Sequence, residues 1–312
     1  MYELGHLGLY KNIPKKSMFN STPNYERDSY TLLQYKSHLR NEFLIPLKAD
    51  GDGTGVATIY LQSTESQAIN ITGAGRFYTD AQGTTGESTS AVVGTSLTTL
   101  YVKLSAGSCY LVLTKADKLS GLGSNTTNVI TEAANAPFIN GCNIGYKLHN
   151  VIYIRLAANT KSFFTGSIDN CPNLERILLI NNLLSSFTGS IGSTPNLIYL
   201  DIFGNLLSSF TGDIGKAVKC YYLRTHINTK GTFTYVTRRN NWGSTFTSLW
   251  VSCSSMTSAM VDNLLIDLDA SGAMPAGDKR INLGGLCGAV TSLSEAARAS
   301  LVSKGFTVVV NT

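Results

Sequence analysis

The sequence predicts a mainly β fold, in which a small β-sandwich-like domain is followed by a repeat solenoid and an α/β C-terminal cap. Three observations predict this fold class. Short β-branched or aromatic segments, separated by Gly, Asp and Ser turns, lie between residues 42 and 118. An asparagine then recurs with a 23-residue period, and helical and extended patterns alternate after residue 255. The predicted divisions are 1–41, 42–118, 119–254 and 255–312.

The repeated asparagine closes one pattern, as in Leu197-x-x-Leu200-x-Ile202-x-x-Asn205. A copy that begins at Cys220 is weaker. This spacing is the leucine-rich-repeat signature, whose period lies in the range of about 20–29 residues. The amides are expected to point inward and to bond backbone groups that the turns leave free. They would form a structural ladder of Asn159, Asn182, Asn205 and Asn228.

A second marker keeps the same period. Phe-Thr-Gly begins at Phe164, Phe187 and Phe210, and Phe233-Thr234 continues the series. Each repeat is therefore expected to have a second extended segment after its asparagine. Because one repeat cannot bury its apolar side alone, the copies are expected to stack around one continuous core.

The residues between the inward positions of each repeat strand are expected to point outward, because side chains alternate along a strand. Stacked in register, they make an aromatic face with Arg at its sides and one acidic group. Tyr and Arg are favoured at protein interfaces, and flat rings also suit sugars. The alternative is that this face packs on the chain itself or on a neighbouring subunit. The candidate partner-binding residues are Tyr153, Arg155, Arg176, Tyr199, Asp201, Phe203, Tyr222, Arg224 and His226.

Residues 1–41 have the features of an attachment arm. They are rich in Tyr and in basic residues, and Pro14 and Pro23 interrupt their periodicity. The pattern of Ser29–Arg40 predicts a short helix. Two interpretations stay open, an arm that orders on a partner and a tail that packs on its own chain. The candidate anchoring residues are Tyr2, Tyr10, Lys15, Lys16, Phe19, Tyr25, Arg27, Tyr30 and Tyr35.

Two further regions can be assigned in detail. A turn is expected at Asp50-Gly51-Asp52-Gly53 rather than a calcium loop, because no terminal Glu follows at the required distance. The cap is expected to have a helix that begins after Thr257 or Ser258 and a second that begins after Ser292 or Ser294. The expected strands are Phe43–Lys48, Val56–Gln62, Ala68–Thr72, Arg76–Thr79, Leu100–Leu104, Tyr110–Thr114, Arg280–Leu283 and Phe306–Val310.

The composition narrows the function classes. Charged residues make up 14% of the chain, and the net charge of +5 is spread without a Lys/Arg run, so we expect no nucleic-acid partner. No apolar stretch reaches about 18 residues, so we expect no membrane span. The first twenty residues lack the apolar core of a signal peptide. The six cysteines form no C-x-x-C pair, and we expect buried free thiols rather than disulfides.

Little in the sequence points to catalysis. The four histidines are isolated, and no metalloprotease, serine-hydrolase, Walker or dinucleotide motif occurs. Asp201 and Asp213 lie on different segments of one repeat, which does not require a paired-carboxylate site. We therefore expect a protein that is not an enzyme and that has no cofactor and no metal site.

Several motifs in residues 45–312 resemble leucine-rich-repeat virion proteins of tailed bacteriophages that infect Bacteroidota. They are Ile69–Gly83, Tyr101–Leu104 before Ser105-Ala106-Gly107, the Thr-Gly-Asp/Ser-Ile repeats, Val261–Asp269 and Gly305–Val308. The resemblance implies a fibre, appendage or decoration protein, and a homo-oligomer that is trimeric by analogy. Ser-Phe-Thr-Gly-Asp-Ile after Asn205 also resembles the segment after the Asn of plant-type repeats, without its Pro.

The function expected from the sequence is therefore that of a bacteriophage virion structural protein, made in the host cytoplasm and located in the virion. Its arm would contact other virion proteins of the capsid or tail. Its repeats would bind a protein or a host-surface protein or glycan. The alternatives are a bacterial cell-surface adhesin that lacks its signal peptide and an intracellular interaction scaffold.

Overall fold

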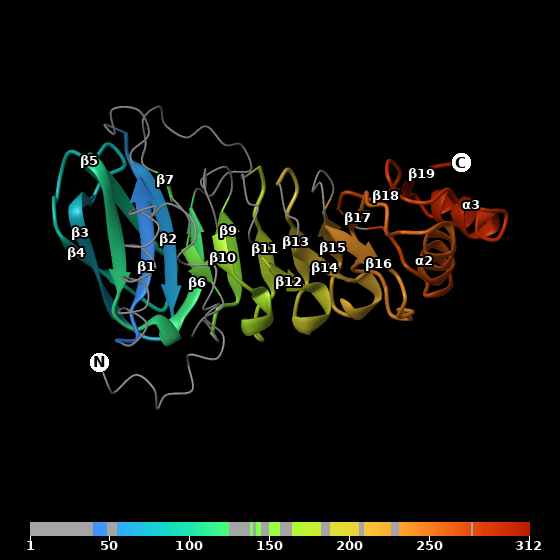
Figure 1. Cartoon of the computed structure of the whole chain (residues 1–312), viewed down its shortest axis with the longest axis horizontal. Helices are drawn as coiled ribbons and strands as arrows, with labels where there is room; N and C mark the ends of the chain where they lie inside the picture. The colour runs from blue at the N-terminus through green and yellow to red at the C-terminus, as the bar shows by residue number, and fades with distance from the viewer. Residues whose placement is uncertain are drawn as a thin grey trace, which may run out of the picture. The chain divides into compact units, whose positions relative to one another are not determined.

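The protein is described by a computed structural model, which is mainly β and contains one large, mostly parallel sheet (Figure 1). Residues Asn41–Thr312 form one compact unit. The predicted anchoring residues, the turn at 50–53 and nearly all of the predicted helix at 29–40 lie outside the described residues. The structure describes residues 40–48, 55–124, 138–139, 142–144, 150–156, 164–181, 188–205, 209–225, 231–275 and 277–312.

The first part of the sheet is antiparallel, and it confirms the predicted strands near residues 43 and 56. Two predicted pairs of strands are instead single long strands, β3 and β5. Their pairing runs past Gly73, whose φ is +92°, and shifts register between Gly73 and Gly75. The glycines thus form an irregularity within one long antiparallel pair of strands rather than the turn that the sequence predicts. The strands are β1 (Phe43–Lys48), β2 (Ala57–Ser63), β3 (Gln67–Tyr78), β4 (Ser90–Val93) and β5 (Thr98–Leu113).

The antiparallel and parallel parts of the sheet share β6 (Leu119–Ser124), which follows the short 3-10 turn η3 (Ala116–Lys118). β6 pairs antiparallel with β2 on one side and parallel with the first repeat strand, β9 (Tyr153–Leu156), on the other.

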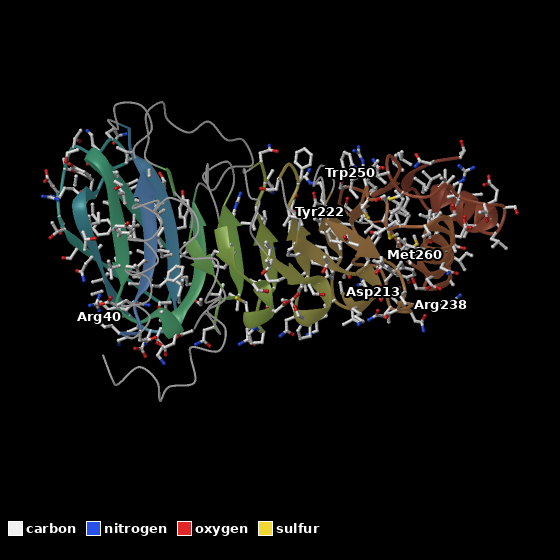
Figure 2. All side chains as sticks on the ribbon, viewed as in Figure 1. Arg40, Asp213, Tyr222, Arg238, Trp250 and Met260 are labelled. Atoms are coloured by element: carbon white, nitrogen blue, oxygen red, sulfur yellow. The ribbon has the colours of Figure 1, made fainter. Side chains whose placement is uncertain are left out.

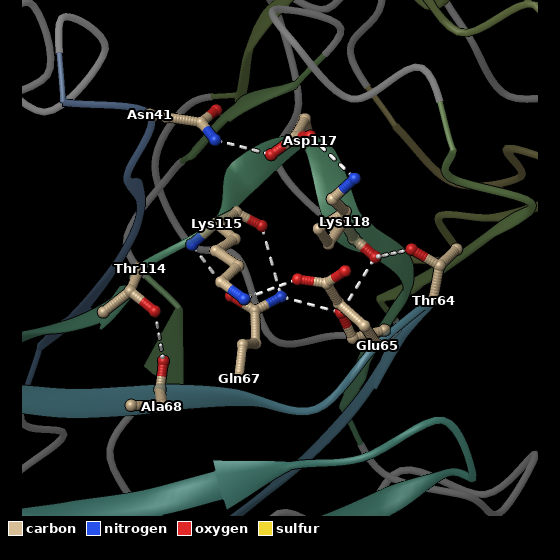
Figure 3. Close-up of polar contacts among 10 residues, drawn as sticks. Asn41, Thr64, Glu65, Gln67, Ala68, Thr114, Lys115, Asp117 and Lys118 are labelled. Atoms are coloured by element: carbon tan, nitrogen blue, oxygen red, sulfur yellow. Dashed lines mark hydrogen bonds and ion pairs between the residues drawn. The ribbon is translucent and has the colours of Figure 1, made fainter.

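Side-chain amides fasten the turn before β6 (Figure 3). Asn41 donates from Nδ2 to the carboxylate of Asp117, and Asn150 donates from Nδ2 to the Asp117 carbonyl. The Lys115 N–H donates to Gln67 Oε1 over 2.9 Å. The entry into the repeats is therefore fixed to the start of β1 and to β3.

The repeat strands pair in parallel in sequence order, and each is one repeat further along the chain. Their inward positions are buried, as the pattern predicts; Ile177 and Leu200 are completely inaccessible and Leu223 almost so. The predicted Cys220 position is buried too. The strands are β9, β11 (Arg176–Leu178), β13 (Tyr199–Asp201), β15 (Tyr222–Arg224) and β17 (Ser248–Trp250).

The second extended segment of each repeat is confirmed. β12 (Thr188–Ser190), β14 (Ser209–Asp213) and β16 (Thr232–Thr234) form a separate parallel sheet, and β10 (Phe164–Gly166) pairs with β8 (Cys142–Ile144). Phe210 of β14 and Phe233 of β16 are buried. A 3-10 turn then returns the chain in η4 (Ile168–Asn170), η5 (Ile191–Ser193) and η6 (Ile214–Lys216). The strand β7 (Phe138–Ile139) pairs with β1.

The two helices and two strands predicted after residue 255 form, and the strands continue the series of parallel strands. β17, β18 (Arg280–Leu283) and β19 (Thr307–Val310) pair in register, with α2 (Ser258–Ala270) and α3 (Glu295–Ser303) between them in sequence (Figure 1). Thr257 caps α2 by accepting from the Met260 N–H. Ser294 precedes α3 but donates its hydroxyl to the buried carboxylate of Asp262, which ties the two helices together.

Candidate binding face

The outward residues of the parallel strands form continuous rows, because each strand pairs with the next without a shift in register. Tyr199 lies between Arg176 and Tyr222, and the same row continues into the cap. The first outward row contains Tyr153, Arg176, Tyr199, Tyr222, Ser248, Arg280 and Thr307. The second contains Arg155, Leu178, Asp201, Arg224, Trp250, Asn282 and Val309. The period read from the sequence thus places eight of the nine candidate residues on one side of the sheet, with Phe203 directly after β13; His226 lies outside the described residues.

Tyr199 and Tyr222 stack face to face, with ring centroids 4.1 Å apart and an interplanar angle of 2°. Figure 2 shows where Tyr222 and Trp250 lie among the side chains of the repeat strands. Both stacked rings are half-buried, and burial raises the pKa of each phenol. Since each ring covers one face of the other, this pair presents edges and hydroxyls as well as flat faces.

Asp201 is the residue for which the expectation of an exposed position is wrong. Its side chain lies in the outward row, yet the residue is only 1% exposed. Arg224, one strand further on, donates from Nε to Oδ1 over 3.0 Å and from Nη2 to Oδ2. The Phe203 N–H also donates to Oδ1. Burial therefore raises the pKa of Asp201, while Arg224 and Tyr222 act in the opposite direction.

Two arginines of the face lie over aromatic rings. The Arg224 guanidinium lies 5.0 Å from the centre of the Phe203 ring, and Arg280 lies 5.0 Å from the centre of the Trp250 ring. Such contacts hold a guanidinium flat against a ring and leave one side of it for a partner. Arg176 is exposed, and Arg155 is half-buried.

Trp250 and Arg280 extend the face beyond the residues that the sequence singles out. Their strands carry the same alternation, in Ser248-Leu249-Trp250-Val251 and Arg280-Ile281-Asn282-Leu283. That alternation is the signal by which the sequence could identify them. The 23-residue spacing does not reach them, because Trp250 follows its neighbour Arg224 by 26 residues (250 − 224) and α2 lies between β17 and β18.

At the start of the face, Tyr153 lies over Gly121 of β6, and a Cβ built on that glycine would be 2.1 Å from the Tyr153 ring. The Tyr153 hydroxyl is buried and finds no hydrogen-bond partner within the described part of the chain. Burial raises the pKa of Tyr153 to about 12. This outward tyrosine is thus held against β6 and presents less of its ring to solvent than the sequence suggests.

The one ladder asparagine within the described residues behaves as predicted. Asn205 is buried, and its Nδ2 donates to the carbonyls of Leu179, Ile202 and Phe203. These carbonyls belong to two successive repeats, so the amide joins neighbouring turns. Asn159, Asn182 and Asn228 lie outside the described residues.

In the described ranges, no three His, Cys, Asp or Glu side chains gather where they could hold a metal ion. No helix there combines the length and the apolar character needed to cross a membrane. Comparison with protein-family models, with curated proteins and with solved structures finds no match to this chain.

Proposed function

We propose that the parallel part of the chain is a leucine-rich-repeat solenoid, preceded by a β-sandwich-like spacer and closed by the α/β cap. The in-register parallel pairing of β9, β11, β13, β15 and β17 supports this proposal. Buried leucines at the inward positions and the Asn205 bonds between repeats support it as well. In such a stack each repeat contacts only the repeat before it and the repeat after it.

The function proposed for this architecture is that of a non-enzymatic bacteriophage virion structural protein, of head-fibre, tail-fibre or decoration type. The arm at residues 1–41 would anchor it to other virion proteins. The repeats would then display the outward rows for binding. The single observation that carries the binding role is the in-register row from Tyr153 to Arg280, which gathers tyrosines and arginines on one side of the sheet with the buried Ser248 between Tyr222 and Arg280.

The chemistry of the face favours a protein partner. Tyr and Arg are the side chains that most often anchor protein interfaces. A sugar ring would need a free aromatic face, and the Tyr199–Tyr222 stack occupies one face of each ring. The hydroxyl edges and the cations over Phe203 and Trp250 are better suited to backbone carbonyls and carboxylates of a protein.

The anchoring role is tested by isolating particles from infected cultures and probing for this chain. Co-purification through a density gradient, with the arm protected from protease only on the particle, is the expected result. A chain found only free in lysate would contradict the virion role and favour the scaffold alternative, and one found on the bacterial envelope would favour the adhesin.

The binding role is tested separately with the full chain. Tyr199→Ala with Tyr222→Ala should weaken binding to host cells or to purified virion proteins by at least about tenfold, as expected for anchor residues. Tyr101→Ala in β5 is the matched aromatic control and should bind like the unmodified chain. Equal binding by the double variant and the control would contradict the role of the face.

A further inference from the structure

Two cysteines meet where the chain leaves β17 and β18. Cys253 follows β17, Cys287 follows β18, and each is 5% exposed. The residues just before the two cysteines are hydrogen-bonded, since the Leu286 N–H donates to Ser252 Oγ over 3.1 Å, and each thiol shifts the pKa of the other. Ser254 and Leu286, next to them in sequence, are exposed, so the pair lies just beneath the surface.

The backbone on both sides holds these two segments together. The Val251 N–H donates to the Asn282 carbonyl over 2.9 Å, and the Gly288 N–H donates to the Met256 carbonyl over 2.6 Å. Cys287 Sγ itself lies 3.4 Å from the Val251 carbonyl oxygen. Bonds before and after the cysteines therefore hold the two segments that carry the thiols side by side.

The surroundings activate one of the two thiols. The neighbouring Cys287 thiol lowers the pKa of Cys253 against the opposing effect of burial, and Ser255 Oγ, 3.3 Å from Cys253 Sγ, adds to the lowering. By contrast, burial raises the pKa of Cys109 and of Cys171 to about 12. A thiolate is the form that attacks a disulfide, so Cys253 is the better nucleophile.

We propose that Cys253 and Cys287 are a modification site that forms an intrachain disulfide, with a small-molecule disulfide such as oxidised glutathione as the oxidant. The Cys253 thiolate attacks one sulfur of the oxidant, whose S–S bond breaks and releases one small thiolate that takes up a proton. Cys287 then loses its proton and attacks Cys253 Sγ, which displaces the second small thiol. Two protein thiols are oxidised, and one small disulfide is reduced to two thiols.

The cross-link closes a loop that contains α2 and β18. It restricts the unfolded chain and so stabilises the folded one, by an amount that increases with the logarithm of the loop length. It also joins the last repeat strand to the cap covalently. The two cysteines would therefore stay reduced in a reducing cytoplasm and form the disulfide after the protein is released into an oxidising medium.

The test incubates the full chain with oxidised glutathione, alkylates the remaining thiols under denaturing conditions and maps the peptides by mass. The expected result is one cross-linked peptide pair that contains Cys253 and Cys287, four alkylated cysteines, and a melting temperature higher by about 5 °C or more. Dithiothreitol should reverse both changes.

Cys253→Ala should abolish the cross-link and the shift in melting temperature, whereas Cys171→Ala, at a buried cysteine in another repeat, should retain both. The mass map of the unmodified chain decides the question even if a variant does not fold. Six alkylated cysteines, a stable glutathione adduct on either residue, or a cross-link between other cysteines overturns the proposal.

Discussion

Arg224 covers the buried carboxylate of Asp201, with Nε 3.0 Å from Oδ1, although both residues belong to the outward side of the sheet. The pair joins neighbouring repeats, since the two residues face each other on β13 and β15. It therefore contributes to the stability of the repeats as well as to the shape of the face.

Arg224→Ala should reduce the free energy of unfolding by about 2–4 kcal/mol, because it leaves the Asp201 carboxylate buried without its cation. The value is at the lower end of the range for buried pairs, since Arg224 is partly exposed and solvent screens it. Urea denaturation measures the loss. Arg176→Ala, an exposed arginine in the same face, is the matched control and should change stability by no more than about 0.5 kcal/mol.

The same variant should make stability depend on pH in a defined direction. Burial already raises the pKa of Asp201, and loss of Arg224 removes a group that lowers it. A raised folded-state pKa contributes stability that is present below the unfolded pKa of about 3.9 and is lost as pH rises through the folded value. Arg224→Ala should thus lose more stability at pH 7 than at pH 4. An equal loss at both pH values, or the same dependence after Asp201→Asn is added, would contradict this.

Asn205→Ala should lower the free energy of unfolding by about 1–3 kcal/mol, because the buried carbonyls of Leu179 and Ile202 lose the amide donor. Asn205→Asp keeps the shape but cannot donate when ionised, so its loss should be larger and should grow between pH 4 and pH 7. Thermal and urea unfolding measure both variants. An unchanged melting temperature for Asn205→Ala would mean that the amide does not join the repeats.

Gly215→Ala should destabilise by about 1–3 kcal/mol or more, because the new Cβ would be 1.5 Å from the Thr237 carbonyl oxygen, which is backbone and cannot turn aside. Gly192 is the equivalent position one repeat earlier. There the nearest atom is 3.0 Å away on the flexible Lys216 side chain, so Gly192→Ala should cost about 0.5 kcal/mol or less. Equal melting temperatures for the two variants would contradict the close packing of η6 against the next turn.

Tyr153→Phe should leave stability unchanged or raise it at pH 7, since the hydroxyl that it removes is buried without a partner among the described residues. The pKa of Tyr153 is raised to about 12 by burial. Its contribution is therefore present below the unfolded pKa of about 10 and lost as pH rises towards 12. The variant should unfold at higher pH than the unmodified chain in a circular-dichroism titration. Unfolding at the same pH would show that Tyr153 ionisation does not limit alkaline stability.

The sequence predicts the repeat strands well because one fixed spacing determines both the inward and the outward positions. Leu200 and Tyr199 take opposite sides for that reason alone. Some of the predicted strand boundaries before the repeats are wrong, because no fixed spacing exists there to guide the prediction. The irregularity at Gly73 and Gly75 reads as a turn in the sequence, since glycine suits both structures.

The position of the candidate face follows from the sequence, but its chemistry does not. The 23-residue period predicts which residues share a row, but it does not predict which neighbouring side chains in a row will interact. Asp201 and Arg224 are opposite charges on adjacent strands, so the row itself contains a signal for their pairing. The stacking of Tyr199 on Tyr222 depends on side-chain rotamers, which the spacing leaves undetermined.

β6 hydrogen-bonds to β2 on one side and to β9 on the other. A pull along the strand direction is therefore resisted at this junction by backbone hydrogen bonds in shear rather than by a flexible linker. Together with the Asn41 and Asn150 bonds to Asp117, this leaves no hinge at the junction among the described residues. The orientation of the outward rows is consequently set by the antiparallel strands. A force applied to the face is transmitted to the antiparallel strands without rotation at the junction.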